Sequence, residues 1–293
     1  MHSQLRLVSL LAGLAMLPLM RADATHSVTD DLGRVITLGA TPRRIISLAP
    51  SITETLFALG SGNELVGVTD FCNYPPEAKE KTRVGGITNP SIESIVGLKP
   101  DLIVLSMEGN VREDFNKLLA VGVPVFVTNP RTLAGIHKSI NDLGILTGRT
   151  YEASLLVRAM QQREDSIKML AKSKKTVLLI VSLQPLIVVG NTTFLSELLD
   201  RVGGINVAGT TPSTYPTLSR EAVVASNPEV IIVMSDVLTD INELQNLFPE
   251  WTTLRAFLAH RVFRINSDIV SRPGPRAVDG LTDLYRIIQE GHE

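Results

Sequence analysis

The sequence has few of the residues that mark disulfide scaffolds, metal sites or nucleic-acid surfaces. It contains a single cysteine, Cys72, so no disulfide can form within the chain. Only 4% of its 293 residues are aromatic, and its five histidines show no metal-ligand spacing. A net charge of -2 at pH 7 means that the chain lacks the excess of basic residues that is typical of proteins that bind nucleic acid or anionic lipid. We therefore expect neither a nucleic acid nor a bare metal ion as the partner.

The motifs of common enzyme classes are also missing. The chain has no GxSxG nucleophile elbow, no phosphate-binding loop and no HExxH zinc motif. Neither Cys72 nor any histidine stands in a recognisable catalytic pattern. We therefore expect a protein that is not an enzyme and that carries no cofactor.

The longest apolar run lies at the N-terminus. Arg6 is followed by a mostly apolar stretch, Val8–Leu19, and Ala22-Asp23-Ala24 offers small residues for cleavage. A spanning helix needs about 20 apolar residues, so a run of about 12 is short for the alternative, a membrane anchor. We expect residues 1–24 to be a signal peptide and the mature protein to be soluble in the periplasm. Cys72 is too distant to become a lipid-modified first residue.

Beyond the leader, strand-like runs alternate with helical patterns. Arg44–Leu48 is an apolar, β-branched run, Thr53–Leu59 is a helix candidate that ends at Gly60, and Leu65–Val68 is another strand candidate. This alternation is typical of an α/β fold with parallel-rich sheets.

One helix-turn-strand unit occurs twice. Ser91–Pro100 and Ser219–Pro228 carry serine, glutamate and proline at identical positions, and each precedes a β-branched run. In each copy the serine can cap a short helix, the glutamate lies in its first turn and the proline ends it. A further strand candidate follows each copy, at 125–127 and 262–265. The repetition predicts two similar α/β lobes.

A long helical pattern separates the two copies. Residues 150–175 include no glycine or proline, and Met160 and Ile167 fall on one helical face. We expect one rigid helix of roughly 35 Å there, at about 1.5 Å per residue, between lobes at 25–149 and 176–293. Because clefts between domains are the usual ligand sites of such architectures, the ligand is expected between the lobes. An interaction protein whose cleft is filled by its own side chains is the alternative.

Four segments carry a resemblance to a known class of proteins. They are Leu48–Glu54 (LAPSITE), Asn73–Pro76 (NYPP), Leu98–Leu102 (LKPDL) and Ser271–Arg276 (SRPGPR). With these motifs the chain resembles the helical-backbone class of periplasmic binding proteins, which serve cobalamin, ferric siderophore and haem importers. Within that class it is most similar to the cobalamin-binding members, and the resemblance covers essentially the whole chain after the leader.

The resemblance implies a function and partners. It implies a monomer that captures cobalamin, or a related corrinoid, and delivers it to the permease dimer of an ABC importer in the inner membrane. A ferric siderophore or haem is the alternative ligand.

The resemblance also implies residues of the ligand site. Phe71 and Tyr215 correspond to aromatic walls that hold the corrin between the lobes, because a flat ligand loses water efficiently against flat apolar surfaces. Asp268 and Arg272 correspond to polar positions that reach the amide groups of the corrin, with Ser271 in place of an acidic neighbour. The alternatives are core positions for both aromatic residues, a turn cap for Asp268 and a solvated surface charge for Arg272.

Other positions depart from the cobalamin pattern. Ile87 and Ser106 stand roughly where the class has tryptophans, so a metal chelate other than cobalamin is an alternative ligand. For haem or a siderophore, the Tyr74 phenolate or the Cys72 thiolate are candidate iron ligands. A packed Tyr-Pro-Pro turn and a small buried thiol are the alternatives.

Glu93 and Glu221 occupy the same position in the two repeats. They correspond to the lobe-tip glutamates that the class uses to dock on arginines of the permease. Equivalent carboxylates on two lobes suit a dimeric permease with two equivalent basic sites. The preference of a helix N-terminus for acidic residues is the alternative explanation.

Overall fold

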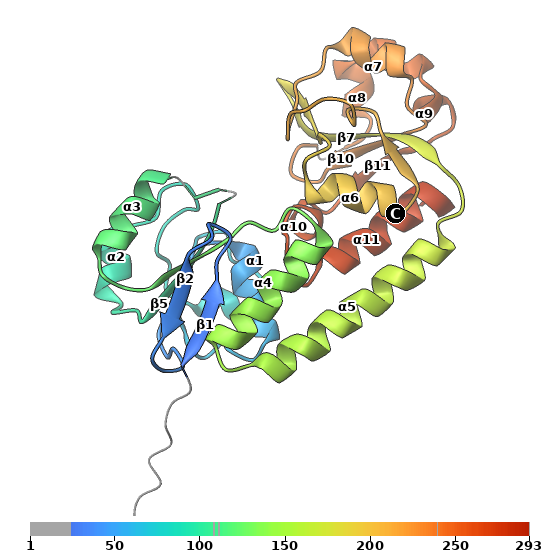
Figure 1. Ribbon diagram of the computed structural model, residues 1–293. Coiled ribbons are helices and arrows are strands. Elements are labelled where there is room, and N and C mark those ends of the chain that lie inside the picture. Colours follow the sequence, from blue (N-terminus) through green and yellow to red (C-terminus); the bar gives the residue numbers. More distant parts are fainter. Residues whose placement is uncertain (1–24, 108, 111, 239, 293) are drawn as a thin grey trace, which may run out of the picture.

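Two α/β lobes joined by one long helix make up the described part of the chain (Figure 1). The computed structural model describes residues 25–107, 109–110, 112–238 and 240–292. The expected leader at 1–24 lies outside them. Within the described residues, no helix combines the length and apolar composition that a bilayer crossing requires.

The first lobe is built on a four-stranded parallel sheet with the strand order β4-β3-β5-β6. An antiparallel pair, β1 and β2, precedes it. The elements of this lobe are β1 (His26–Thr29), β2 (Val35–Leu38), β3 (Ile45–Ser47), α1 (Pro50–Ala58), β4 (Leu65–Val68), a 3-10 helix (Pro76–Glu80), α2 (Ile92–Gly97), β5 (Leu102–Ser106), α3 (Arg112–Ala120), β6 (Val125–Thr128) and α4 (Leu133–Leu146). The strands β3, β5 and β6 are buried and mostly apolar on both faces because helices cover both.

The second lobe has a five-stranded sheet. The strand β7 pairs in parallel with β9 along its first residues and antiparallel with β8 along its last, while β10 and β11 follow on its other side in parallel. Its elements are β7 (Lys175–Leu183), β8 (Leu186–Val188), α6 (Phe194–Arg201), β9 (Gly204–Asn206), α7 (Arg220–Ser226), β10 (Val230–Met234), α8 (Glu243–Leu247), a 3-10 helix (Pro249–Thr253), α9 (Arg255–Leu258), β11 (Val262–Ile265), α10 (Ser267–Val270), α11 (Ala277–Tyr285) and a π-helical turn (Arg286–Glu290).

The two lobes repeat one strand order. The parallel order β4-β3-β5-β6 of the first lobe recurs as β9-β7-β10-β11 in the second. In both copies the predicted serine caps the helix. The Ser91 side chain accepts a hydrogen bond from the backbone N–H of Ser94, and the Ser219 side chain accepts one from that of Ala222. Lys99 (φ 47°) and Asn227 (φ 40°) occupy the same place in the repeat, and both take the left-handed conformation. The prediction of two similar α/β lobes is confirmed.

The connecting helix is α5, Thr150–Leu170. The sequence pattern predicted that this helix would extend to residue 175. It ends at Leu170 instead, because Ala171 takes an extended backbone (φ -73°, ψ 95°) and Lys175 already begins β7. Its buried face includes Met160 and Ile167, as predicted. The helix spans about 30 Å at about 1.5 Å per residue.

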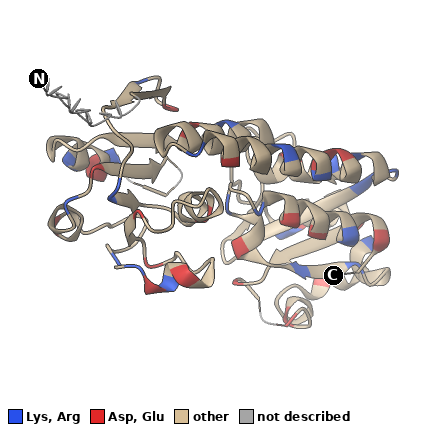
Figure 2. Cartoon of the chain, turned by 90° about the horizontal axis from the view of Figure 1, so that it is seen from below, with Lys and Arg blue, Asp and Glu red and all other residues tan. Residues whose placement is uncertain are grey.

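The apolar core is continuous between the lobes. One cluster of buried side chains runs from the first sheet through α4 and α5 into α11 and the second sheet, and it includes Ile140, Met160 and Leu284. Since a close-packed core resists deformation, the lobes are held in one relative position. Figure 2 shows that residues of both charge signs are distributed over the two lobes, in line with the net charge of -2.

Candidate functional site

A pocket of about 210 Å³ lies between the two lobes. Its lining residues follow the carboxyl ends of four parallel strands, β3, β4, β5 and β11, where ligand sites of α/β folds concentrate. They are Ala49, Pro50, Ser51, Phe71, Ile87 and Ser106 from the first lobe and Asp268, Ser271, Arg272 and Pro273 from the second. We refer to it as the cleft pocket.

The cleft pocket brings together most of the ligand-site residues implied by the resemblance. Phe71, Asp268, Ser271 and Arg272 all line it, whereas Tyr215 does not. Ile87 and Ser106, which stand where the class has tryptophans, line it too. Their small side chains leave room on this wall that two indole rings would occupy.

Phe71 stands at the surface on a well-anchored loop. Its side chain is 57% exposed, so it is not a core residue. The Nη1 atom of Arg83 donates to the carbonyls of Thr69 (2.7 Å) and Cys72 (2.9 Å) on either side of it. The Cys72 thiol is fully buried and accepts a hydrogen bond from Thr53 (3.1 Å). These contacts hold the Phe71 ring at the surface without covering it.

Tyr215 occupies a similar setting in the second lobe. It is 43% exposed, on the segment that runs antiparallel to β8. The N–H of Gly190 donates to the carbonyl of Thr214 (2.8 Å), and β8 donates to the carbonyl of Pro216 (3.0 Å). A Cβ at Gly190 would lie 1.9 Å from the carbonyl oxygen of Ser213, so only glycine permits this close approach. The backbone on both sides of Tyr215 is therefore fixed.

The charged side chains of the cleft form a network between the lobes. The Nη1 atom of Arg272 donates to Glu54 (2.9 Å) and to Asn73 (2.7 Å), and its Nη2 atom donates to Asp268. Asn73 in turn donates to Asp268 (2.8 Å). Arg276 donates to both carboxylate oxygens of Glu54, at 2.8 and 2.6 Å. We call these five residues the interlobe network.

The interlobe network changes the interpretation of two predicted residues. Arg272 is only 8% exposed, so it is not a solvated surface charge, and both of its terminal nitrogens already have partners. Asp268 binds Arg272 and Asn73, and its side chain stays 46% exposed at the wall of the cleft pocket. Hydrogen bonding to Glu54 is the main cause that raises the pKa of Arg276 above its ordinary value, so this cation stays charged.

Glu54 and Asn73 lie in two of the segments that carry the resemblance, but the sequence indicated no role for either residue. Glu54 is 3% exposed, and its helix neighbours Ile52 and Leu56 belong to the core. A carboxylate on the buried face of a helix needs cationic partners. The position of Glu54 between apolar helix neighbours therefore could have indicated a buried ion pair. The partners themselves lie 218 and 222 residues away along the chain.

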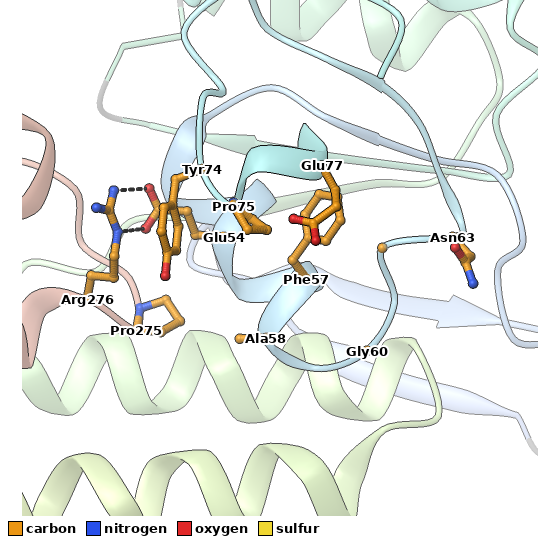
Figure 3. Close-up of a pocket in the computed structure, with 11 residues that line it drawn as sticks. Glu54, Phe57, Ala58, Gly60, Asn63, Tyr74, Pro75, Glu77, Pro275 and Arg276 are labelled. Carbon is orange, nitrogen blue, oxygen red and sulfur yellow. Dashed lines mark hydrogen bonds and ion pairs between the residues drawn. The ribbon is translucent and has the colours of Figure 1, made fainter. Parts of the chain in front are cut away.

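A second pocket, of about 500 Å³, lies beside the interlobe network (Figure 3). Tyr74 lines this pocket, with the guanidinium of Arg276 4.1 Å from its ring centroid. This pocket is larger than the cleft pocket, but it contains none of the residues implied for the corrin site, only the candidate iron ligand Tyr74. Neither Tyr74 nor the buried Cys72 lines the cleft pocket. Among the described residues, no cluster of three or more histidine, cysteine or acidic side chains could hold a metal ion.

Glu93 and Glu221 are exposed in the first turns of α2 and α7. Figure 1 places these two helices on the parts of the lobes away from α5. Neither carboxylate forms an ion pair with another described residue. Hydrogen bonding from its own backbone N–H, followed by the Ser219 hydroxyl, lowers the pKa of Glu221. Both lobes therefore present an available acidic side chain.

Comparison with known proteins identifies the class. A family model described as periplasmic binding protein matches residues 45–269. The chain belongs to the periplasmic binding protein family. Membership of this solute-binding family confirms the predicted class and the prediction that the protein is not an enzyme.

Individual relatives are similar over most of their length. The uncharacterized ABC transporter substrate-binding lipoprotein YvrC of Bacillus subtilis is 31% identical over 272 residues, 89% of this chain and 85% of the relative. The periplasmic vitamin B12 binding protein BtuF of Vibrio cholerae has a TM-score of 0.77 at 28% identity, covering 85% of this chain and 98% of that one. The apo periplasmic heme-binding protein RhuT from Roseiflexus sp. RS-1 has a TM-score of 0.78 at 26% identity, with the same coverage.

Proposed function

We propose that this substrate-binding protein of an ABC transporter captures cobalamin, or a related corrinoid, between its lobes. The observation that carries the proposal is one exposed aromatic side chain on each lobe, Phe71 and Tyr215, together with a pocket between the lobes. Flat apolar faces suit the corrin ring because they remove its surface from water. The similarity to the vitamin B12 binding protein supports this ligand.

The polar groups of the cleft pocket suit the rim of a corrin. The N–H groups of its peripheral amides need acceptors. The half-exposed Asp268 carboxylate accepts from amide N–H groups, and the Ser271 oxygen, whose hydroxyl hydrogen is donated to Ser267, accepts another. Binding forms and breaks no covalent bond.

Delivery follows capture. We infer that Glu93 and Glu221 dock the loaded protein on basic residues of the permease dimer in the inner membrane. Both carboxylates are exposed and lack ion-pair partners among the described residues, so docking breaks no ion pair described within the protein. We also propose that residues 1–24 are removed and that the protein acts as a periplasmic monomer. N-terminal sequencing and sedimentation of the secreted protein test both statements.

Haem or a ferric siderophore is the second candidate ligand. The similarity to a heme-binding protein supports it. Tyr74 contacts Arg276 in the neighbouring pocket and Cys72 is fully buried, so the exposed Tyr215 of the second lobe is the candidate iron ligand of this chain. Haem binding therefore predicts a phenolate-to-iron charge-transfer band that the Tyr215→Phe variant lacks.

Calorimetric titration of the mature protein with cyanocobalamin, haemin and a panel of ferric siderophores tests the proposal. We expect saturable binding of cyanocobalamin alone, in a 1:1 ratio. Binding of haemin or a siderophore without cyanocobalamin would transfer the ligand assignment to the second candidate. Absence of heat with every ligand would favour a protein whose cleft recognises another partner.

A further inference from the structure

The tips of the two lobes share more than an acidic residue. Val96 on α2 is 44% exposed and Val224 on α7 is 38% exposed, and the two valines occupy the same position in the internal repeat. Each lies three residues after its glutamate, Glu93 or Glu221, so valine and glutamate share one helical face. We call each glutamate and valine pair a tip patch.

The local structure of the two tip patches is the same. The residue before each valine, Ile95 or Val223, is fully buried and fixes the rotation of its helix. Serine caps both helices, and the left-handed residues Lys99 and Asn227 end both turns. Because the helices are anchored alike, both valines point out of their lobes together with the glutamates.

A single exposed valine is ordinary, but the same exposed pair on both lobes is a duplicated surface. We propose that the tip patches dock the protein through a combined charged and apolar contact, and that the partner is a pair of identical membrane subunits. Each subunit would present one cation bordered by an apolar side chain. This inference rests on the proposed docking role of the glutamates and adds Val96 and Val224 to it.

The two components of the contact have different physical signatures. Attraction between exposed charges weakens as salt concentration rises, whereas removal of valine methyl groups from water does not. The valines therefore sustain docking at ionic strengths that screen the glutamates. The carboxylates steer the encounter, and the valines slow dissociation.

Photocrosslinking identifies the partner first. A benzophenone amino acid is placed singly at positions 93, 96, 221 and 224 of the full chain in the cells that produce it. Position 169 is the control, since Met169 is 74% exposed on α5, away from the tips. We expect the four tip positions, and not position 169, to crosslink to one ABC permease polypeptide. Crosslinks from 93 and 221 alone would overturn the role of the valines and leave docking intact. The absence of permease crosslinks from all four positions would overturn docking itself.

Affinity for that permease complex, held in lipid nanodiscs, supplies the second readout. We expect V96S and V224S each to raise the Kd about threefold, and the double variant about tenfold, because the two sites are separate. The increase in Kd caused by the valine substitutions should be equal at 50 mM and 500 mM salt. The increase in Kd caused by E93Q combined with E221Q should be smaller at 500 mM than at 50 mM. Double-valine variants that bind like the M169S control at both salt concentrations would overturn the inference.

Discussion

The Nη1 atom of Arg272 lies 2.9 Å from the Oε1 atom of Glu54, and this ion pair joins the cleft of one lobe to the first helix of the other. Glu54 also binds Arg276 at 2.6 Å, and Arg272 binds Asp268. Two carboxylates and two guanidinium groups thus form a neutral set that is almost entirely buried at Glu54 and Arg272. Such a set tolerates burial only while all of its members are present.

Removal of Glu54 should therefore destabilise the protein strongly. We expect Glu54→Ala to lower the free energy of unfolding by about 3–5 kcal/mol, because it leaves the partly buried Arg276 without its carboxylate partner and the buried Arg272 with Asp268 alone. Urea denaturation followed by circular dichroism measures the change. Glu77→Ala is the control, since Glu77 lines the neighbouring pocket but is exposed and should change stability by less than about 0.5 kcal/mol. Equal stabilities for the two variants would show that the network contributes nothing.

The fold could be predicted from local signals, since most of its elements are locally encoded. Leu65–Val68 matches β4, and the repeated serine, glutamate and proline pattern revealed the two lobes. The start of α1 at Pro50 was placed too late, at Thr53, although proline suits the first helical turn. The end of α5 was placed too late because the lysine-rich stretch after Leu170 has no breaker, and strand pairing decides its structure.

The ligand site was predictable only in part. The resemblance to the cobalamin-binding class supplied Phe71 and Asp268, and the structure brings both to the cleft pocket. The partners of Arg272 were not predictable, because an ion pair across 218 residues leaves no periodic signal in the sequence. The sequence also gave no indication that Tyr74 lies outside that pocket, against Arg276.

The exposed side chains of Phe71 and Tyr215 should dominate ligand affinity. We expect Phe71→Ala and Tyr215→Ala each to weaken cyanocobalamin binding by about 10- to 100-fold, because each removes an apolar wall of the corrin. Calorimetric titration measures the change. Tyr151→Ala is the matched control, as Tyr151 is 71% exposed on α5. Wild-type affinity in either cleft variant would remove that residue from the site.

Ligand binding should hardly change the overall shape. The core is continuous through α4, α5 and α11, and the interlobe network spans the cleft, so a large hinge rotation would break packed contacts. We expect the radius of gyration from X-ray scattering to change by less than about 1 Å on addition of ligand. The Glu54→Gln variant should show a larger change, since its interlobe ion pairs are lost. A large compaction of the wild-type protein would contradict the rigid arrangement.

Charge reversal at the lobe tips should separate uptake from capture. We expect Glu93→Lys combined with Glu221→Lys to abolish ligand uptake by cells, because a lysine repels the basic sites of the permease. Calorimetry should find unchanged ligand affinity, since neither residue lines the cleft pocket. Reduced ligand affinity in the purified variant would instead assign these residues to the ligand site.

Glu229 should make stability depend on pH in the acid range. The backbone N–H of Thr176 donates to its carboxylate (2.9 Å), and this bond is the main cause that lowers the pKa of Glu229 below its ordinary value of 4.5. Because the folded pKa is depressed, the stabilisation is complete above the unfolded pKa and is lost as pH falls through the folded value. Solvent screening limits it to about 0.5 kcal/mol. We expect Glu229→Gln to lose less stability than the wild type between pH 6 and pH 3 in urea denaturation, and Glu77→Gln to behave like the wild type. Identical pH profiles for Glu229→Gln and the wild type would show that the bond to Thr176 does not favour the ionised carboxylate.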